Sequence, residues 1–299
     1  MFSTLLGPLP PIAGALESSG EGSPETRDAR LLGELAGTGL ELLATGVRAR
    51  AVAAPDDVVR TWRQAAGATD RPVKQVLEGP YSAGRDGSRT NPIAVAERSR
   101  ATIVALIEAG CPFVEIDEPE ALAITLVEGE RRRFNEAHRV LVDGLEGTHL
   151  SLALTGGNLD AAGPATFFDR PYASYAFDLI AGPDNWRLIA AAPGDRGIVC
   201  GALDPAERGD ETIELLIWAA HYAASTGGRG LARVGLANAP SLAAGSWATA
   251  VRKLGRIAEA TRVASVDSPA EMATLLDDRA FGGRRNRPRA VRLSRPEEA

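Results

Sequence analysis

The chain has 299 residues, of which 44% are hydrophobic and 24% charged, which is the composition of an ordinary globular protein. Its 33 Lys and Arg residues against 39 Asp and Glu give a net charge of -6, which argues against a nucleic-acid binder held by bulk electrostatics. No apolar run is long enough to span a bilayer, the N-terminus lacks the features of a signal peptide, and two cysteines cannot build a disulfide framework. We therefore expect a cytoplasmic protein with no membrane partner and no nucleic-acid partner.

Short apolar runs alternate with helical patterns along the chain. Each run is apolar almost throughout, as expected for strands buried on both faces of a parallel sheet. The eight runs are Ser3–Leu6, Leu40–Ala44, Val73–Leu77, Pro112–Asp117, Leu150–Thr155, Tyr175–Ile180, Gly197–Leu203 and Arg233–Asn238. Eight strands over roughly 260 residues predict a single (β/α)8 TIM barrel over residues 1–265, followed by a C-terminal extension over 266–299. A doubly wound open sheet is the alternative, although it normally has fewer strands.

The segments between the runs carry helix signals. Asn91 supplies an N-cap and Pro92 a first-turn proline, and apolar residues then share one face until Gly110. Further helices are predicted over Asp56–Ala66, Glu120–Leu145, Asp210–Ala224 and Ser246–Ala260. The sequence contains neither a dinucleotide-binding fingerprint nor a Gly-x-x-x-x-Gly-Lys phosphate loop.

Two segments lie outside this alternation. Glu17–Thr26, rich in Gly, Ser and Glu, is predicted to be a mobile loop after the first strand, over the active face of the barrel. Phe281–Ala299 is rich in arginine, which is typical of a solvated tail or of an arm packing on a sister subunit in a homodimer. A basic arm that binds nucleic acid is the less favoured interpretation.

In a (β/α)8 barrel the catalytic groups stand at the carboxyl ends of the strands. The residues at these positions are Gly7, Pro8, Thr45, Arg48, Glu78, Tyr81, Asp117, Glu118, Asn158, Asp178, Asp204 and Asn238. Trp186 follows the sixth strand and is a candidate pocket wall. The set is acidic and contains no histidine or cysteine, so a loop would have to supply a thiolate nucleophile or a histidine base.

The fourth run ends in two adjacent carboxyl groups, Asp117 and Glu118, followed by Pro119. Burying an unpaired charge is costly, so these groups either bind a substrate ammonium, act as acid or base, or are tied to an arginine or to helix N–H groups. Tyr81 is a candidate proton or hydrogen-bond donor. Lys74, early in its strand, requires a partner or a shifted pKa if it is buried.

We predict that catalysis rests on Asp117, Glu118 and Tyr81. The predicted substrate-binding residues are Gly7, Thr45, Arg48, Asn158, Asp178, Trp186, Asp204 and Asn238. His138 and His221 lie within predicted helices, where surface or packing roles are expected. Cys111 and Cys200 are expected to be small buried residues.

Four segments carry a resemblance to a known family. The first segment, Leu6–Pro10, is Leu-Gly-Pro-Leu-Pro, and the second, Gly39–Gly46, is similar to the second strand of that family. The third, Lys74–Tyr81, contains Gly-Pro, and the fourth, Ile116–Pro119, is Ile-Asp-Glu-Pro. In this order the segments resemble the C-terminal catalytic barrel of cobalamin-independent methionine synthase, in the superfamily that it shares with uroporphyrinogen decarboxylase. The resemblance covers roughly Thr4–Thr261. It implies a barrel that transfers a methyl group from a folate to the thiol of homocysteine.

The resemblance also implies a zinc ion that deprotonates this thiol. The family's His-x-Cys ligands fall on Ala153 and Thr155, or, with an insertion, on His149 and Ser151. Its last cysteine ligand falls near Pro240 or Ser241.

Two further positions of the family are also changed. Its Glu ligand falls near Asp178, and Val47 replaces the Glu that the family uses on the amino-acid substrate. We therefore predict no metal and no other cofactor. A Mg²⁺ or Mn²⁺ site on Asp117, Glu118, Asp178 and Asp204 is the alternative.

Three functions fit these observations. The prediction is an enzyme that acts on a small polar metabolite without zinc, by methyl or alkyl transfer or by a lyase-type reaction, in specialised metabolism. The alternatives are a genuine folate-dependent S-methyltransferase and a non-catalytic protein that binds a small molecule.

Overall fold

The fold was analysed in a computed structural model of the chain. It describes residues 1–12, 24–85, 91–124, 127–145, 147–206, 212–266, 268, 270–272 and 274–276. Within these ranges no helix combines the length and the apolar character that a transmembrane segment requires. The predicted arginine-rich tail and most of the predicted loop over residues 17–26 lie outside the described residues.

The strands form one eight-stranded parallel sheet in the order β1-β8-β7-β6-β5-β4-β3-β2. Their bounds are β1 Phe2–Ser3, β2 Arg48–Ala49, β3 Gln75–Glu78, β4 Phe113–Asp117, β5 His149–Leu154, β6 Ser174–Asp178, β7 Gly197–Leu203 and β8 Val234–Asn238. The ring closes between β1 and the segment before β2, where Leu42 N–H donates to the Ser3 carbonyl at 3.0 Å. The (β/α)8 barrel predicted from the sequence is thereby confirmed.

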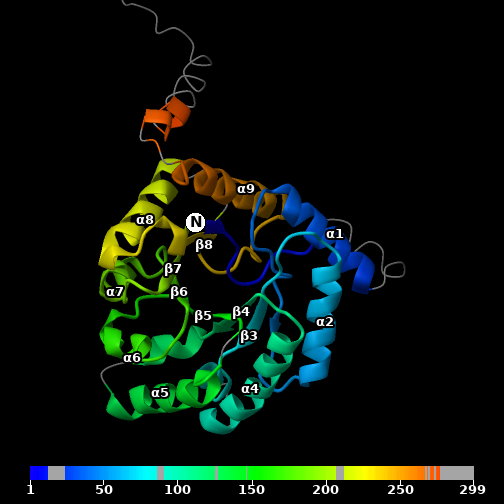
Figure 1. The fold of residues 1–299 in the computed structure, drawn as a ribbon, viewed down its shortest axis with the longest axis vertical. Helices are drawn as coiled ribbons and strands as arrows, with labels where there is room; N and C mark the ends of the chain where they lie inside the picture. The colour runs from blue at the N-terminus through cyan, green and yellow to red at the C-terminus, as the bar shows by residue number, and fades with distance from the viewer. Residues whose placement is uncertain are drawn as a thin grey trace, which may run out of the picture.

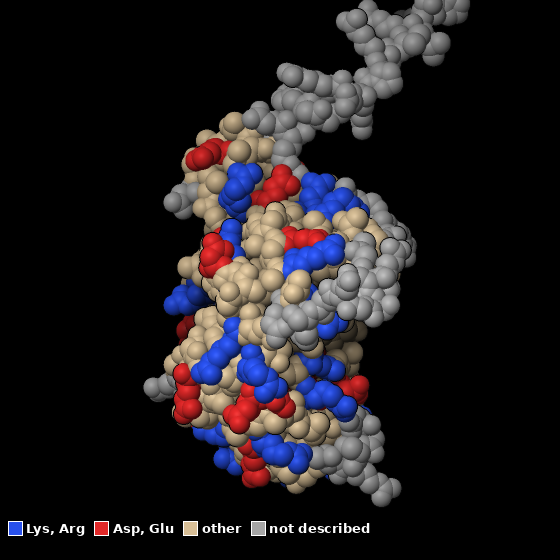
Figure 2. Space-filling view, turned by 90° about the vertical axis from the view of Figure 1, so that its right-hand side faces the viewer, with Lys and Arg blue, Asp and Glu red and all other residues tan. Residues whose placement is uncertain are grey.

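Helices surround the sheet (Figure 1). Their bounds are α1 Pro24–Gly37, α2 Pro55–Gly67, α3 Pro80–Ala83, α4 Pro92–Glu108, α5 Glu128–Val142, α6 Pro164–Phe168, α7 Trp186–Ala191, α8 Ile213–Ser225 and α9 Trp247–Ala264. The last long helix, α9, lies beside α1 and completes the outer ring (Figure 1). On the face drawn in Figure 2, basic and acidic side chains are interspersed.

Several predicted elements differ from the observed ones. The run Ser3–Leu6 shares only Ser3 with β1, and residues 24–26 of the predicted loop begin α1. The run Leu40–Ala44 contributes only a bridge from Leu43 to Val73, and β2 forms further along the chain at Arg48–Ala49. The helix predicted over Glu120–Leu145 is instead a 3-10 turn, η1 Pro119–Ala123, followed by α5. Apolar content alone did not reveal either break, because it reports burial and not backbone direction.

Among the described residues, the buried apolar side chains form two main regions and a small third cluster of Ala51, Ala83 and Val95. Most buried side chains pack between the sheet and the helices. A smaller cluster fills the barrel interior and consists of Leu6, Ala153, Ala176, Val199 and Ala237. Because these interior side chains are mostly small, they leave space at the end of the barrel where the strands terminate.

Candidate functional site

A cavity of about 300 Å³ opens at the carboxyl ends of the strands. It is lined by Leu5, Leu6, Gly7, Pro8, Ala44, Gly46, Val47, Arg48, Val76, Glu115, Asp117, Pro119, Ala153, Thr155 and Pro240. This is the end at which (β/α)8 enzymes carry their active sites. Three of the predicted site residues, Gly7, Arg48 and Asp117, line the cavity.

Asp117 is the half-buried carboxyl group of this cavity. Its Oδ2 lies 2.9 Å from Arg48 Nη1, and Arg48 Nη2 lies 3.7 Å from Glu78 Oε1. Burial raises the pKa of Asp117 to about 6, against the opposing effect of Arg48, and the nearby Glu115 raises it further. A carboxyl group with a pKa of this size exchanges its proton near neutral pH.

Glu115 lies on the floor of the cavity and is paired from below. Its Oε2 accepts a hydrogen bond of 2.6 Å from Lys74 Nζ, which also donates to the Leu5 carbonyl at 2.7 Å. Both charged side chains are almost fully buried. The expectation that a buried Lys74 needs a partner is therefore confirmed, and Glu115 is that partner.

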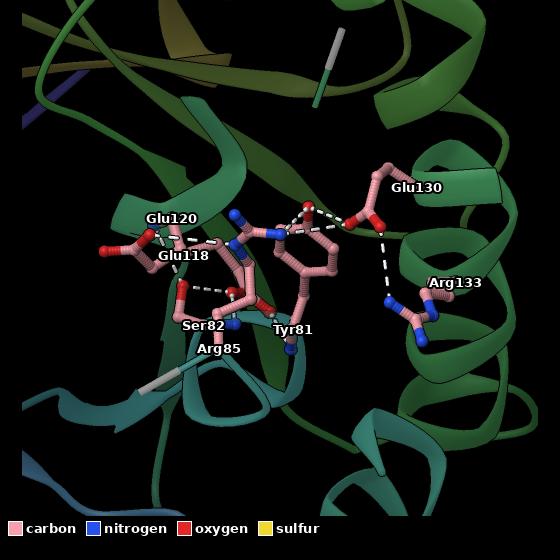
Figure 3. A network of polar contacts seen from close by, with 7 residues as sticks. All are labelled: Tyr81, Ser82, Arg85, Glu118, Glu120, Glu130 and Arg133. Atoms are coloured by element: carbon pink, nitrogen blue, oxygen red, sulfur yellow. Dashed lines mark hydrogen bonds and ion pairs between the residues drawn. The ribbon is translucent and has the colours of Figure 1, made fainter. Parts of the chain in front are cut away.

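Glu118 points away from the cavity although it follows Asp117 directly. Its carboxyl oxygens accept hydrogen bonds from Tyr81 N–H at 2.9 Å, from Ser82 N–H at 2.7 Å and from the Ser82 hydroxyl at 2.5 Å (Figure 3). His138 Nε2 lies 3.0 Å from Glu118 Oε1. A Cβ on Gly79 would overlap this carboxyl group, which explains the glycine of the Gly-Pro pair.

His138 was expected at the surface or in packing, and the structure shows the second role, with the side chain completely buried against this carboxyl group. Its Nδ1 lies 2.5 Å from the Tyr172 hydroxyl. Both ring nitrogens are satisfied when Nε2 carries the proton and Tyr172 donates to Nδ1. The helical context of His138 in the sequence contains no signal of this contact, because its partners come from two other elements.

Tyr81 is buried within the same network. Its hydroxyl donates to Glu130 Oε2 at 2.7 Å on α5, and the Arg85 guanidinium lies beside it (Figure 3). Burial raises the pKa of the Tyr81 hydroxyl well above its ordinary value. Neither Tyr81 nor Glu118 lines the cavity, so their hydrogen bonds fix the loops after β3 and β4 around it.

We expect Glu118→Gln to lower the free energy of unfolding by about 1–3 kcal/mol, because the new amide would face two backbone N–H donors and leave one unsatisfied. Urea denaturation measures this loss. The matched control is Glu120→Gln, at an exposed carboxyl group 3.8 Å from Arg85, with an expected change below about 0.5 kcal/mol. Equal stabilities of the two variants would contradict the structural role of Glu118.

Two other predicted site residues, Asp178 and Asn238, hold backbone segments at this end of the barrel. Asp178 accepts from the N–H groups of Gly156, Ile180 and Ala181. Asn238 joins β8 to β1 through Leu6 N–H at 3.1 Å and the Leu6 carbonyl at 2.8 Å.

Four further predicted residues also lie outside the cavity lining. Asn158 bonds the backbone and carboxyl group of Asp184, and Asp204 accepts from Ala206 N–H. The Thr45 hydroxyl accepts from Val47 N–H at 3.4 Å. Trp186 packs on Trp218 and Tyr222 of α8.

Several lining residues were not among the predicted site residues, above all Glu115, while Val47 was noted only as the position of a substrate-binding Glu in the resembled family. Glu115 had a usable signal, because alternate residues of a strand share a face and Glu115 lies two positions before Asp117. The two cysteines are buried, as expected. Burial raises the pKa of the Cys111 thiol to about 11, which disfavours a thiolate at neutral pH.

The donor set does not fit the zinc ion that the resemblance implies. Ala153 and Thr155 line the cavity, whereas His149 lies at the other end of β5 with its ring stacked on Phe113. The register without an insertion is therefore the one that reaches the site. Among the described residues, no three His, Cys, Asp or Glu side chains are grouped to hold a metal ion, and this includes the carboxyl groups considered for Mg²⁺ or Mn²⁺.

No protein-family model and no curated protein match the sequence. Solved structures do match the fold. A B12-independent methionine synthase from Shewanella sp. W3-18-1, in complex with selenomethionine, aligns with a TM-score of 0.66 at 13% identity, over 94% of this chain and 98% of that one. The likeness is one of fold.

Two other barrels align at lower scores. A 2-keto 3-deoxygluconate aldolase from Picrophilus torridus aligns with a TM-score of 0.51 at 9% identity, over 95% of this chain and 86% of that one. D-psicose 3-epimerase from Clostridium cellulolyticum H10 aligns with a TM-score of 0.50 at 11% identity, over 88% and 98% of the two chains. At these identities the barrel is shared, and the reaction has to be inferred from the cavity.

Proposed function

We propose that the chain is an enzyme that transfers a proton to or from a small molecule bound in the cavity at the carboxyl ends of the strands. The observation that carries this proposal is Asp117, a half-buried carboxyl group with a pKa near 6 at the cavity wall. A base or acid of this strength works at neutral pH without activation by a metal. The barrel neighbours that are named as enzymes make catalysis the favoured alternative to simple binding.

The residues have separate roles in this proposal. Asp117 accepts a proton from the substrate and returns one to the product, and it can also hold a substrate ammonium. Arg48, 2.9 Å away, stabilises negative charge that develops on the substrate beside it. Glu115 stays on the floor with its charge balanced by Lys74.

This arrangement favours a lyase-type or isomerising reaction over methyl transfer. Methyl transfer to a thiol needs a thiolate, and the cavity lining offers neither a metal ligand set nor a cationic group beyond Arg48. Proton transfer at a carbon next to a carbonyl needs only a base and a positive group near the developing oxyanion. Asp117 and Arg48 supply these two elements.

The proposal is tested by incubating the protein in D2O with a panel of small oxo acids, hydroxy acids, amino acids and sugars. Protein-dependent exchange of a substrate C–H for deuterium, followed by NMR, is the expected result. Exchange reports the proton transfer even when the complete reaction needs a second substrate. If the protein exchanges no C–H of any compound in these classes, the proposal is contradicted.

We expect the exchange rate to fall as the pH decreases through about 6, because protonated Asp117 cannot act as a base. Burial raises the pKa of this carboxyl group, so the loss occurs well above the range of an exposed aspartate. A pH profile of the exchange rate measures this midpoint. A midpoint near pH 4 would mean that the base is a solvated carboxyl group elsewhere.

A further inference from the structure

The charged groups of the cavity are confined to two strands, and most of its other lining side chains are apolar. Its charged groups come from β4 and β2, with Glu115 and Asp117 on β4 and Arg48 on β2. Pro240 follows β8, which lies opposite β4 in the closed ring. A molecule held at Asp117 therefore extends across the barrel toward uncharged side chains.

Apolar lining residues stand opposite β4 and also beside Arg48. Leu6 and Pro8 follow β1, next to β8 in the sheet, and Val47 stands at the mouth before β2. Leu6 and Ala153 belong to the apolar cluster that fills the barrel interior below. These walls offer dispersion contacts and almost no hydrogen-bonding side chains to the far end of a ligand.

Several positions at which the resemblance implies a metal ligand or a substrate-binding Glu lie in this lining, with the last cysteine ligand near Pro240 or Ser241, whereas Asp178, near the position of the Glu ligand, does not line the cavity. Val47, Ala153, Thr155 and Pro240 all line the cavity, and three of the four carry only carbon beyond the backbone. At three of these positions an apolar side chain therefore lines the volume in which the resemblance implies polar groups. Such a surface binds the apolar part of a ligand.

We propose that the substrate has an apolar body with one polar end, and that this body lies against Val47, Leu6 and Pro240 while the polar end contacts Asp117. This inference rests on the proposed function, because it places the reacting end at Asp117. It replaces the expected small polar metabolite by an amphiphilic one. The cavity of about 300 Å³ is at the lower limit for a small-ligand pocket, which suits a short chain or a single ring.

The test compares two probes that share an ammonium group and have the same number of non-hydrogen atoms. n-Pentylamine ends in a methyl group, whereas 4-aminobutan-1-ol ends in a hydroxyl group. Ligand-observed NMR titration at about pH 8, where Asp117 is ionised, gives both dissociation constants. We expect n-pentylamine to bind about tenfold more tightly, because a buried hydroxyl group would find no partner among the apolar lining residues.

Two exposed valines provide a matched pair of variants. Val47 is 66% exposed and lines the cavity, whereas Val52 is 67% exposed and does not. Val47→Asn is expected to reduce the preference for n-pentylamine at least threefold, by giving the hydroxyl group a partner, and Val52→Asn to leave it unchanged. Both side chains are so exposed that neither substitution should disturb folding.

The outcomes separate this inference from the proposed function. Equal affinity for the two probes, or a preference unchanged in Val47→Asn, would overturn the apolar subsite and leave the role of Asp117 intact. Retention of the preference in Asp117→Asn with no loss of affinity for either amine would instead overturn the placement of the polar end. Binding of neither amine at millimolar concentrations would overturn the inference as a whole.

Discussion

Asp117→Asn is expected to lower the rate of substrate deuterium exchange by about 100-fold or more, the usual contribution of a positioned acid or base. The amide occupies the same space and can still contact Arg48, but it cannot accept the transferred proton. The exchange rates of the two proteins in D2O are measured with the first compound found to react, and their ratio gives the effect of the substitution. The residual rate should also lose its dependence on a group with a pKa near 6.

The stability of the Asp117→Asn variant shows whether Asp117 has a catalytic or a structural role. Its raised pKa means that the folded protein binds this proton more tightly than the unfolded chain between about pH 4 and 6, so the fold loses stability as the pH rises through that window. We therefore expect Asp117→Asn to be at least as stable as the original protein at about pH 8. A large loss of stability together with the loss of exchange would indicate that the carboxyl group supports the fold.

Asp160→Asn is the matched control for this substitution. Asp160 also pairs with an arginine, at 3.1 Å from Arg187, but it lies on the 3-10 turn η2 Asp160–Ala162 and does not line the cavity. We expect its exchange rate to stay within twofold of the original, because an exposed ion pair contributes little. If both variants lose exchange equally, the effect of Asp117→Asn is not local to the cavity.

Lys74→Met is expected to lower the free energy of unfolding by about 3–5 kcal/mol, because it leaves the Glu115 carboxyl group buried without its partner. Lys74 donates to Glu115 and to the Leu5 carbonyl, so a backbone acceptor also loses its donor. Urea denaturation at neutral pH measures the change.

The double variant Lys74→Met with Glu115→Leu is the control. Replacing both members of a buried pair by apolar side chains removes the uncompensated charge, so we expect most of the lost stability to return. Failure of the double variant to recover would mean that the loss comes from packing or from the Leu5 carbonyl. A Lys74→Met variant as stable as the original would show that water in the cavity solvates Glu115.

Several features of the site followed from the sequence because they depend on local pattern. The rule that strand ends carry the chemistry placed Gly7, Arg48 and Asp117 at the cavity, and all three line it. Adjacent residues of a strand point to opposite faces, which is why Asp117 faces the cavity and Glu118 faces the helix layer. The same alternation would have predicted that Glu115, and not Glu118, faces the cavity together with Asp117.

Other features needed contacts between distant segments. Asn238 was predicted to bind substrate, yet it joins β8 to β1 across 232 residues of chain. His138 has the packing role that was one of the two expected, but its hydrogen-bond partners Glu118 and Tyr172, from two other segments, were not predicted. No local pattern contains such partners, since they become neighbours only when the ring closes.

The sequence by itself determined the alternation of buried parallel strands and helices, because short apolar runs separated by helical patterns must be covered on both faces, and the number of runs favoured a closed barrel over an open sheet. The tertiary structure alone decided which of the predicted polar groups reach the cavity and which partners they meet. Closure of the ring sets Pro240 opposite β4, pairs Lys74 with Glu115 and turns Glu118 toward His138. These are encounters between residues far apart in the chain, and the free energy of each depends on burial and distance that only the folded state defines.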